Sequence, residues 1–92
     1  MIRSFACRET EHLYLTGKSR KFQSCAKAAL RKLDQLQVAV DLNDLRIPPG
    51  NHLEALWGDR AGQHSIRIND QWRVCFRWEG ENAFDVEIVD YH

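Results

Sequence analysis

The sequence lacks the features that mark several large classes of protein. It has no apolar run near 18 residues, and its first residues show no signal-peptide pattern. Its three cysteines are widely spaced and never form a Cys-x-x-Cys pair, which favours reduced thiols over a disulfide framework or a zinc site. The four histidines show no metal-ligand spacing, and there is no glycine-rich phosphate loop. These absences predict a cytoplasmic protein without a metal, a cofactor or a membrane partner.

What is present describes a small globular protein. With 92 residues, 43% of them hydrophobic, we expect a single domain over residues 1–92. The net charge is zero but unevenly distributed: residues 1–32 contain eight Lys and Arg against two acids, and residues 33–92 contain five Arg against eleven acids. This predicts a basic helical surface that meets a polyanion or an acidic protein, with two merely solvated helix faces as the alternative.

Helical patterns occupy the first half of the chain. Residues 8–16 carry acids near their start and are followed by Gly17, as in a short helix. Residues 22–40 place apolar side chains at three- and four-residue steps, which predicts a longer helix whose apolar stripe packs on a sheet. A basic loop at residues 18–21 joins the two helices, and residues 2–5 are predicted as a short strand.

Residues 58–78 have the pattern of a β-hairpin. Apolar and polar residues alternate along residues 65–68 and 72–78, on either side of the loop 69–71. Side chains on one face must pair across the strands, and the register that achieves this places Ile66 opposite Val74.

The same register places Arg67 directly opposite Arg73 on the polar side, with Arg77 further along. Like charges in such a pair destabilise a sheet by some tenths to about 1 kcal/mol, unless carboxylates or a bound anion neutralise them. The polar side of the hairpin is therefore a candidate site. Cys75 lies between Arg73 and Arg77 and is expected to have a lowered pKa, although nothing else marks it as a nucleophile.

Strand patterns fill the rest of the chain. Residues 53–56 are a predicted strand, preceded by a proline-containing loop. In the last strand Phe84, Val86 and Ile88 are expected to face the core, while Asp85 and Glu87 neutralise some of the arginines. Helices followed by an antiparallel meander predict an α+β fold, with two N-terminal helices packed on a small antiparallel sheet.

The chain ends in three groups that accept, donate or relay protons: Asp90, Tyr91 and His92. Unperturbed pKa values of about 6.5 for His and about 10 for Tyr suit acid and base roles near neutrality. The alternative is a terminus that takes no part in chemistry.

These residues resemble a known family. Gly58-Asp59-Arg60, residues 69–76 and residues 86–92 are similar to HigB-type toxins, including the GraT-like ones, of the RelE/ParE toxin–antitoxin superfamily. The resemblance covers essentially the whole chain, and its most specific parts are residues 72–73 and 90–92. It implies a RelE-like microbial RNase fold and a ribosome-dependent, metal-independent mRNA endonuclease. In that reaction a 2′-hydroxyl attacks the adjacent phosphate and a 5′-hydroxyl product leaves.

The resemblance also implies partners and residue roles. The partners are a HigA-like helix-turn-helix antitoxin, the bacterial ribosome with its 16S RNA, and mRNA in the A site; operator DNA is reached only through the antitoxin. Arg73, aided by Arg60 and Arg67, is expected at the phosphate. His92 or Glu54 is the expected base, Tyr91 stacks on a base or shares proton transfer, and Asp90 orients its neighbours. The basic residues expected on ribosomal RNA are Lys18, Arg20, Lys21, Lys27, Arg31 and Lys32.

The sequence departs from the family pattern at two positions. Some HigB proteins have a histidine where this chain has Glu54, and some have a basic residue where it has Trp57. These differences predict a slower enzyme than a histidine-bearing relative. Two alternatives are a ParE-like gyrase poison that cleaves no RNA, and a degenerate toxin that only titrates its antitoxin and operator.

Overall fold

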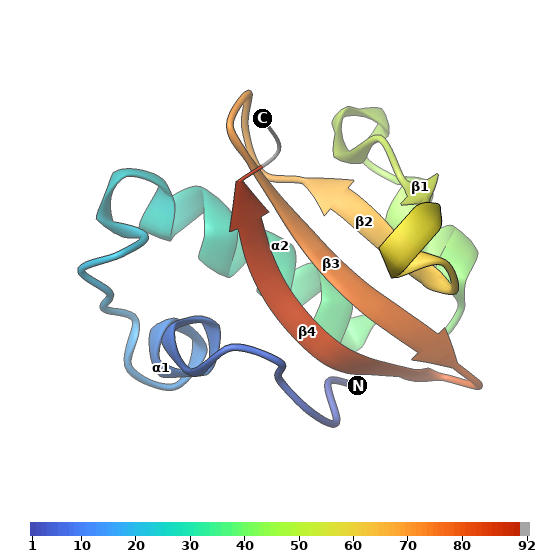
Figure 1. Cartoon of the computed structure of the whole chain (residues 1–92), viewed down its shortest axis with the longest axis horizontal. Coiled ribbons are helices and arrows are strands. Elements are labelled where there is room, and N and C mark those ends of the chain that lie inside the picture. The colour runs from blue at the N-terminus through green and yellow to red at the C-terminus, as the bar shows by residue number, and fades with distance from the viewer. Residues whose placement is uncertain (91–92) are drawn as a thin grey trace.

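The computed structural model describes residues 1–90 and shows two α-helices against a four-stranded antiparallel sheet (Figure 1). The helices are α1 (Arg8–Thr16) and α2 (Ala26–Val38), and the strands, in their spatial order, are β1 (Glu54–Ala55), β2 (Gln63–Arg67), β3 (Trp72–Glu79) and β4 (Asn82–Asp90). In Figure 1, α2 crosses behind the sheet and the 3₁₀ helix η4 (Gly58–Arg60) lies in front of it. The predicted α+β fold is confirmed.

The hydrophobic core lies between α2 and the sheet. Ala29, Leu33 and Leu36 of α2 are fully buried, which confirms the stripe predicted from the sequence. The buried strand residues in the same core are Ile66, Val74, Phe76, Ala83, Val86 and Ile88. Because side chains alternate along a strand, the other face of the sheet is left for their polar neighbours.

The long helix begins later than predicted. Residues 22–25 precede α2 and include a 3₁₀ turn, η1 (Gln23–Cys25). The N–H of Phe22 donates to Ser19 Oγ (3.0 Å), and the N–H of Cys25 donates to the Phe22 carbonyl (3.0 Å). These local hydrogen bonds replace the first predicted helical turn, while Phe22 and Cys25 still reach the core.

The predicted hairpin register between β2 and β3 is confirmed. Arg67 pairs with Arg73, two residues before the loop on one strand and after it on the other. Asn69 holds the loop, because its Oδ1 accepts hydrogen bonds from the N–H groups of Gln71 (2.9 Å) and Trp72 (2.8 Å). Asn commonly forms such a side-chain turn.

The prediction that Phe84 faces the core is wrong. A register shift interrupts the pairing of β3 with β4, and Asp85 adopts a left-handed φ of 54° there. The extra residue shifts the alternation, so Ala83 is fully buried and Phe84 is only half-buried. Val86 and Ile88 are buried as predicted.

The two shortest predicted strands contain fewer strand residues than predicted. Of residues 53–56 only the two residues of β1 are in a strand, and residues 2–5 make isolated parallel bridges to β4 instead of a strand of their own. Segments this short form few ladder hydrogen bonds, so contacts with the rest of the fold decide their conformation.

The N-terminal part of the chain covers the outer edge of β4. The N–H of Val86 donates to the Ser4 carbonyl (3.0 Å). Further along the strand, the N–H of Ile88 donates to Oγ1 of the buried Thr10 in α1 (3.0 Å). The last strand is therefore hydrogen-bonded on both sides at these positions.

Candidate active site

The face of the sheet opposite α2 carries a row of directly paired side chains. Glu54 of β1 pairs with Ser65 of β2, Ser65 pairs with Cys75 of β3, and Cys75 pairs with Glu87 of β4. Directly paired residues share a face, so this row crosses all four strands. The next row of the same face is Arg67, Arg73 and Val89. We call the surface formed by these two rows the polar face.

Arg73 is held in the middle of the polar face and is only 5% exposed. Its Nε donates to Ser65 Oγ (2.8 Å), and its Nη2 donates to the backbone carbonyl of His52 (2.6 Å). These acceptors fix the plane of the guanidinium group. A positive charge that is poorly screened by water interacts strongly with an approaching anion.

A buried amide supports the carbonyl that Arg73 contacts. Asn51 is fully buried; its Nδ2 donates to Gln35 Oε1 (2.8 Å), and its Oδ1 accepts from Lys32 Nζ (2.6 Å). His52 follows with a left-handed φ of 45°, which is uncommon outside glycine and persists where neighbouring contacts fix it. Side chains of α2 are thereby linked through this loop to the guanidinium of Arg73.

Asp85 and Glu87 each neutralise an arginine, as predicted, although the partner of Glu87 is Arg60 and not one of the strand arginines. Arg60 Nη1 lies 2.8 Å from Glu87 Oε1, and this hydrogen bond raises the pKa of the Arg60 guanidinium. Arg77 Nε lies 2.8 Å from Asp85 Oδ2, despite the register shift at that residue. Both arginines therefore remain cationic while their charge is partly balanced.

The prediction of a lowered pKa for Cys75 is wrong. The side chain is 1% exposed, and burial raises the pKa of its thiol. The charges of Arg60 and Arg73 act in the opposite direction but do not outweigh burial, and Glu87 opposite adds to the rise. Cys75 is therefore a protonated packing residue near neutral pH, unsuited to nucleophilic attack.

The side chains of the paired residues Arg67 and Arg73 contact different partners. Arg67 Nη2 contacts the carboxylate of Asp70 in the hairpin loop, while Arg73 contacts Ser65. The like-charge repulsion predicted for this pair is thus reduced by a carboxylate on one side.

Of the remaining catalytic candidates, Glu54 lies on the polar face and Asp90 lies on the opposite face of the sheet. Glu54 is exposed and lies on the polar face through its pairing with Ser65. Asp90 pairs with Trp72, and its Oδ2 accepts a hydrogen bond from Gln71 Nε2 (3.2 Å). Alternation therefore places Asp90 on the sheet face that carries Trp72, one residue away from Arg73 in register. The other two candidates, Tyr91 and His92, lie outside the described residues.

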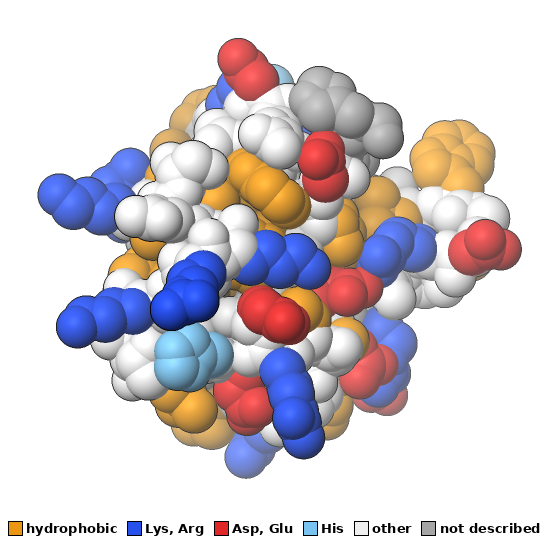
Figure 2. Space-filling view, turned by 60° about the vertical axis from the view of Figure 1, so that its left-hand side comes forward, with side chains coloured by type: hydrophobic (Ala, Val, Ile, Leu, Met, Phe, Trp, Pro, Cys, Tyr) orange, Lys and Arg blue, Asp and Glu red, His pale blue; other side chains and the backbone are white. Residues whose placement is uncertain are grey.

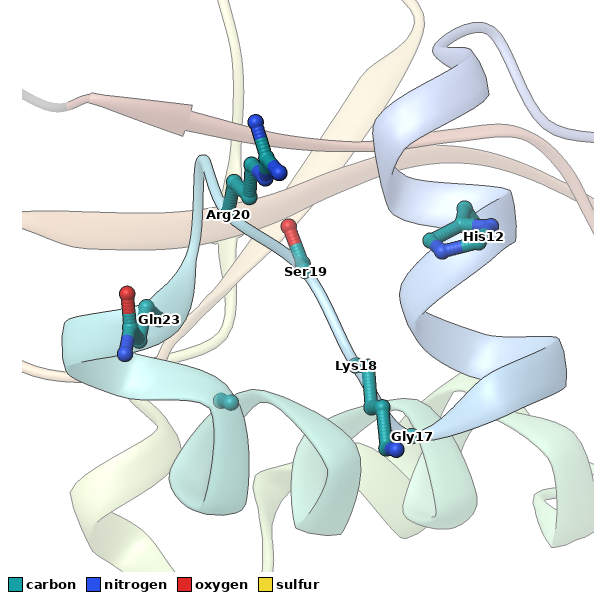
Figure 3. Close-up of a pocket in the computed structure, with 7 residues that line it drawn as sticks. His12, Gly17, Lys18, Ser19, Arg20 and Gln23 are labelled. Carbon is teal, nitrogen blue, oxygen red and sulfur yellow. The ribbon is translucent and has the colours of Figure 1, made fainter.

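Exposed basic residues surround a hollow between α1 and the loop that follows it. His12, Lys18, Ser19, Arg20 and Gln23 are among the residues that line it, and in Figure 3 the His12 ring projects from α1 towards the loop. Figure 2 turns this side of the molecule forward and shows several Lys and Arg side chains projecting from it. The predicted RNA-binding residues that are exposed here and on α2 are Lys18, Arg20, Lys21, Lys27 and Arg31.

Lys32 differs from these residues. It is half-buried, and its ammonium group donates to Asn51. Burial, together with the nearby charges of Arg31 and Arg67, lowers the pKa of Lys32. The ammonium group of Lys32 therefore makes a hydrogen bond within the protein, and nothing in the structure supports its expected contact with RNA.

Three contributors to the polar face were missed in the sequence. Ser65 could be predicted from the sequence, because the predicted register places it diagonally across from Arg73, and a hydroxyl readily accepts a hydrogen bond from a guanidinium. Asn51 and the His52 carbonyl belong to an irregular loop, where no periodic pattern identifies inward-facing groups.

Comparison with known proteins identifies the family. A family model described as the RelE-like toxin of the type II toxin-antitoxin system HigB matches residues 3–92. The chain belongs to this family of HigB-like toxins. It is therefore a toxin of a type II toxin–antitoxin system, and its partner is an antitoxin. This HigB-like toxin is 40% identical over 80 residues to Toxin HigB-1 of Vibrio cholerae. The aligned residues make up 85% of this chain and 84% of that protein.

Solved structures show that the HigB-like toxin has a RelE-like fold. YafQ from E. coli matches with a TM-score of 0.62 at 12% identity, over 99% of this chain and 92% of YafQ. A chain of the YoeB-YefM toxin-antitoxin complex from Staphylococcus aureus matches with a TM-score of 0.63 at 20% identity, over 100% of this chain and 98% of that one. At these identities the likeness concerns the fold.

Two further findings hold for residues 1–90 of the HigB-like toxin. No group of three or more His, Cys, Asp or Glu side chains is placed to hold a metal ion. No helix in this part of the chain has both the length and the apolar character needed to cross a membrane.

Proposed function

We propose that this HigB-like toxin is a ribosome-dependent, metal-independent mRNA endonuclease that inhibits translation in the cytoplasm. The observation that carries the proposal is the nearly buried Arg73, whose guanidinium is fixed by Ser65 and the His52 carbonyl. A planar guanidinium offers two parallel donors to the oxygens of a phosphate. The family of the chain favours RNA as the source of that phosphate.

The proposed reaction is an in-line displacement at phosphorus. The 2′-oxygen of a ribose forms a bond to the adjacent phosphorus while the bond to the 5′-oxygen breaks, giving a cyclic phosphate and a 5′-hydroxyl. A base takes the proton of the 2′-hydroxyl, and an acid gives a proton to the leaving oxygen. The step requires orientation, proton transfer and stabilisation of negative charge.

We assign Arg73 to the non-bridging oxygens, where negative charge grows. Arg60 and Arg67 contribute positive charge near the phosphate. Neither is assigned a direct contact, because each is already paired with a carboxylate that the RNA would have to displace. Glu54, exposed on the polar face, and His92 are the two candidates for the base. Tyr91 is assigned to stacking or proton transfer and Asp90 to orienting its neighbours.

The proposed partners follow from the surface charge and the family. The exposed basic residues beside α1 and on α2 contact 16S ribosomal RNA, and the A site presents the mRNA. The antitoxin is a HigA-like helix-turn-helix protein, and operator DNA is bound through it alone.

Mapping of mRNA 5′ ends after brief expression tests the proposal. We expect new ends inside translated frames, associated with particular codons, for the wild type. Arg46→Gln, which replaces an exposed arginine outside the polar face, should give the same ends, whereas Arg73→Gln should give almost none. Circular dichroism and antitoxin binding verify that each variant is folded.

Two results would contradict the proposal. DNA damage without mRNA cuts would identify a ParE-like gyrase poison. Neither DNA damage nor mRNA cuts, with antitoxin binding intact, would identify a protein that only titrates its antitoxin.

A further inference from the structure

Trp57 is the most exposed large hydrophobic side chain within residues 1–90, with 88% of its surface accessible. The other two tryptophans, Trp72 and Trp78, are half-buried against the core. An indole in water adds nothing to the core, and this one belongs to the segment between Glu54 and Arg60, two residues that reach the polar face. Resting on the proposed function, we propose that Trp57 is a platform on which an mRNA base near the cleaved phosphate stacks.

The position of Trp57 links it to the polar face. It lies between β1, which contributes Glu54, and η4, which contributes Arg60. The N–H of Arg60 donates to the Trp57 carbonyl (3.1 Å), and the guanidinium of Arg60 reaches Glu87 (2.8 Å) in the row across the sheet. The segment that carries the indole is therefore linked at both ends to the surface that contains Arg73.

The backbone on both sides of Trp57 is fixed. The N–H of Leu56 donates to the Gln63 carbonyl (2.9 Å), and the N–H of Ala61 donates to the Gly58 carbonyl (3.1 Å). Gly58 has a φ of 61°, a left-handed conformation that turns the chain directly after the tryptophan. A ring with two side-chain torsions on a fixed backbone loses little conformational entropy when it orders against a base.

A flat ring and a cation in one short segment, whose backbones are hydrogen-bonded to each other, suit a nucleotide in a single strand. The π-face of the base stacks on the indole while the attached phosphate interacts with a guanidinium. Every base has a π-face, so this contact adds affinity without choosing between sequences. Trp57 therefore acts as a substrate-binding residue whose effect is similar at all codons.

The test uses ribosomes programmed with an mRNA whose A-site codon is 2′-deoxy, so that the toxin binds without cleaving. We expect Trp57→Ala to raise the dissociation constant of the toxin about tenfold or more, and Trp57→Phe to restore most of the loss. Val38→Ala, which truncates another exposed apolar side chain (75% accessible), should bind as the wild type does. Indole fluorescence should be quenched on binding in the wild type and much less in Trp57→Phe.

The outcomes separate this inference from the function on which it rests. If the wild type cleaves unmodified mRNA but Trp57→Ala binds equally well, the stacking role is overturned and the endonuclease stands. If Trp57→Ala weakens antitoxin binding and leaves ribosome binding unchanged, the tryptophan is a protein contact and the inference is overturned. If the wild type leaves unmodified mRNA intact on these ribosomes, both proposals fall.

Discussion

At the scale of single residues, Arg73 combines a permanent charge with 5% exposure. Burying a charge is costly unless hydrogen bonds compensate it, and here a serine hydroxyl and a backbone carbonyl do so. Both acceptors are neutral. The positive charge is therefore oriented by these two contacts without being cancelled by them.

We expect Arg73→Lys to reduce mRNA cleavage by about 10²- to 10³-fold, because lysine keeps the charge but lacks the planar fork. Primer extension on ribosome-bound mRNA measures the rate. Arg77→Lys is the matched control, since Arg77 lies on the same strand, is half-exposed and pairs with Asp85 and Glu79. Near-wild-type cleavage by Arg73→Lys would contradict the role assigned to Arg73.

The buried thiol of Cys75 makes stability depend on pH in the alkaline range. The native state keeps a proton that the unfolded chain releases above about pH 8.5, because burial raises the native pKa. The contribution of Cys75 is therefore complete below that pH and is lost as the pH rises towards the native pKa. We expect the free energy of unfolding to decline between about pH 8 and 10, because the decline begins near the reference pKa of a thiol.

Urea titrations at several pH values measure this decline. Cys75→Ala should make it shallower, while Cys7→Ala, at a half-exposed position, should keep the wild-type slope. Cys25 is also buried with a raised pKa and accounts for part of the slope that remains. Identical slopes in all three proteins would show that the Cys75 proton is not linked to folding.

At the scale of elements, α1 is attached to the sheet through a buried hydroxyl. Thr10 Oγ1 accepts the N–H of Ile88 in β4. Thr10→Val keeps the shape and removes the acceptor, so we expect it to destabilise the protein by about 1–3 kcal/mol. Thr10→Ser keeps the hydroxyl and loses one methyl group, so a loss of about 0.8 kcal/mol is expected.

Chemical denaturation of the three proteins compares these values. If Thr10→Val is as stable as the wild type, water or another group satisfies the Ile88 N–H and the hydroxyl does not fasten α1.

Elements with a regular pattern could be predicted from the sequence, and irregular ones could not. The β2–β3 register follows from alternation, because a slip of one residue would move Ile66 and Val74 out of the core. The shift at Asp85 follows from no such pattern, since Phe84 is as apolar as Ala83 and only packing decides which is buried. Local hydrogen bonds at residues 19–25 likewise replaced a helical turn that the apolar spacing alone favoured.

The candidate site divides in the same way. Arg67, Arg73 and Arg77 lie on regular strands and could be placed by counting residues, whereas Arg60 lies in the 3₁₀ helix η4. The groups that orient Arg73 include a backbone carbonyl of an irregular loop, and the conformation of that loop depends on the buried contacts of Asn51 with α2. Sequence patterns record side-chain polarity, and they carry no signal for the direction of a single carbonyl.

At the scale of the whole molecule, a chain of zero net charge has a strongly basic part. Some acids of the second half pair with arginines of their own half, as in Arg60–Glu87 and Arg77–Asp85, and not with the lysines beside α1. The long-range field near α1 is therefore positive even though the total charge is zero.

Replacing basic residues in this region should change the salt dependence of ribosome binding. We expect the double variant Lys18→Gln, Arg20→Gln to lower the slope of log affinity against log salt by about 1 to 2. The double variant Arg3→Gln, Arg46→Gln has the same net charge and should keep the slope. Sedimentation with ribosomes at increasing salt measures both, and equal slopes would remove Lys18 and Arg20 from the RNA contact.

The N-terminal segment alongside β4 has a consequence for how copies of the toxin behave towards one another. A strand at the border of a sheet can recruit a strand from another molecule and start aggregation. Here β1 is too short to serve as a template at one border, and bonds such as Val86 to Ser4 occupy the other. By occupying the hydrogen-bonding groups on the outer edge of β4, the first few residues prevent that edge from pairing with a strand of another molecule.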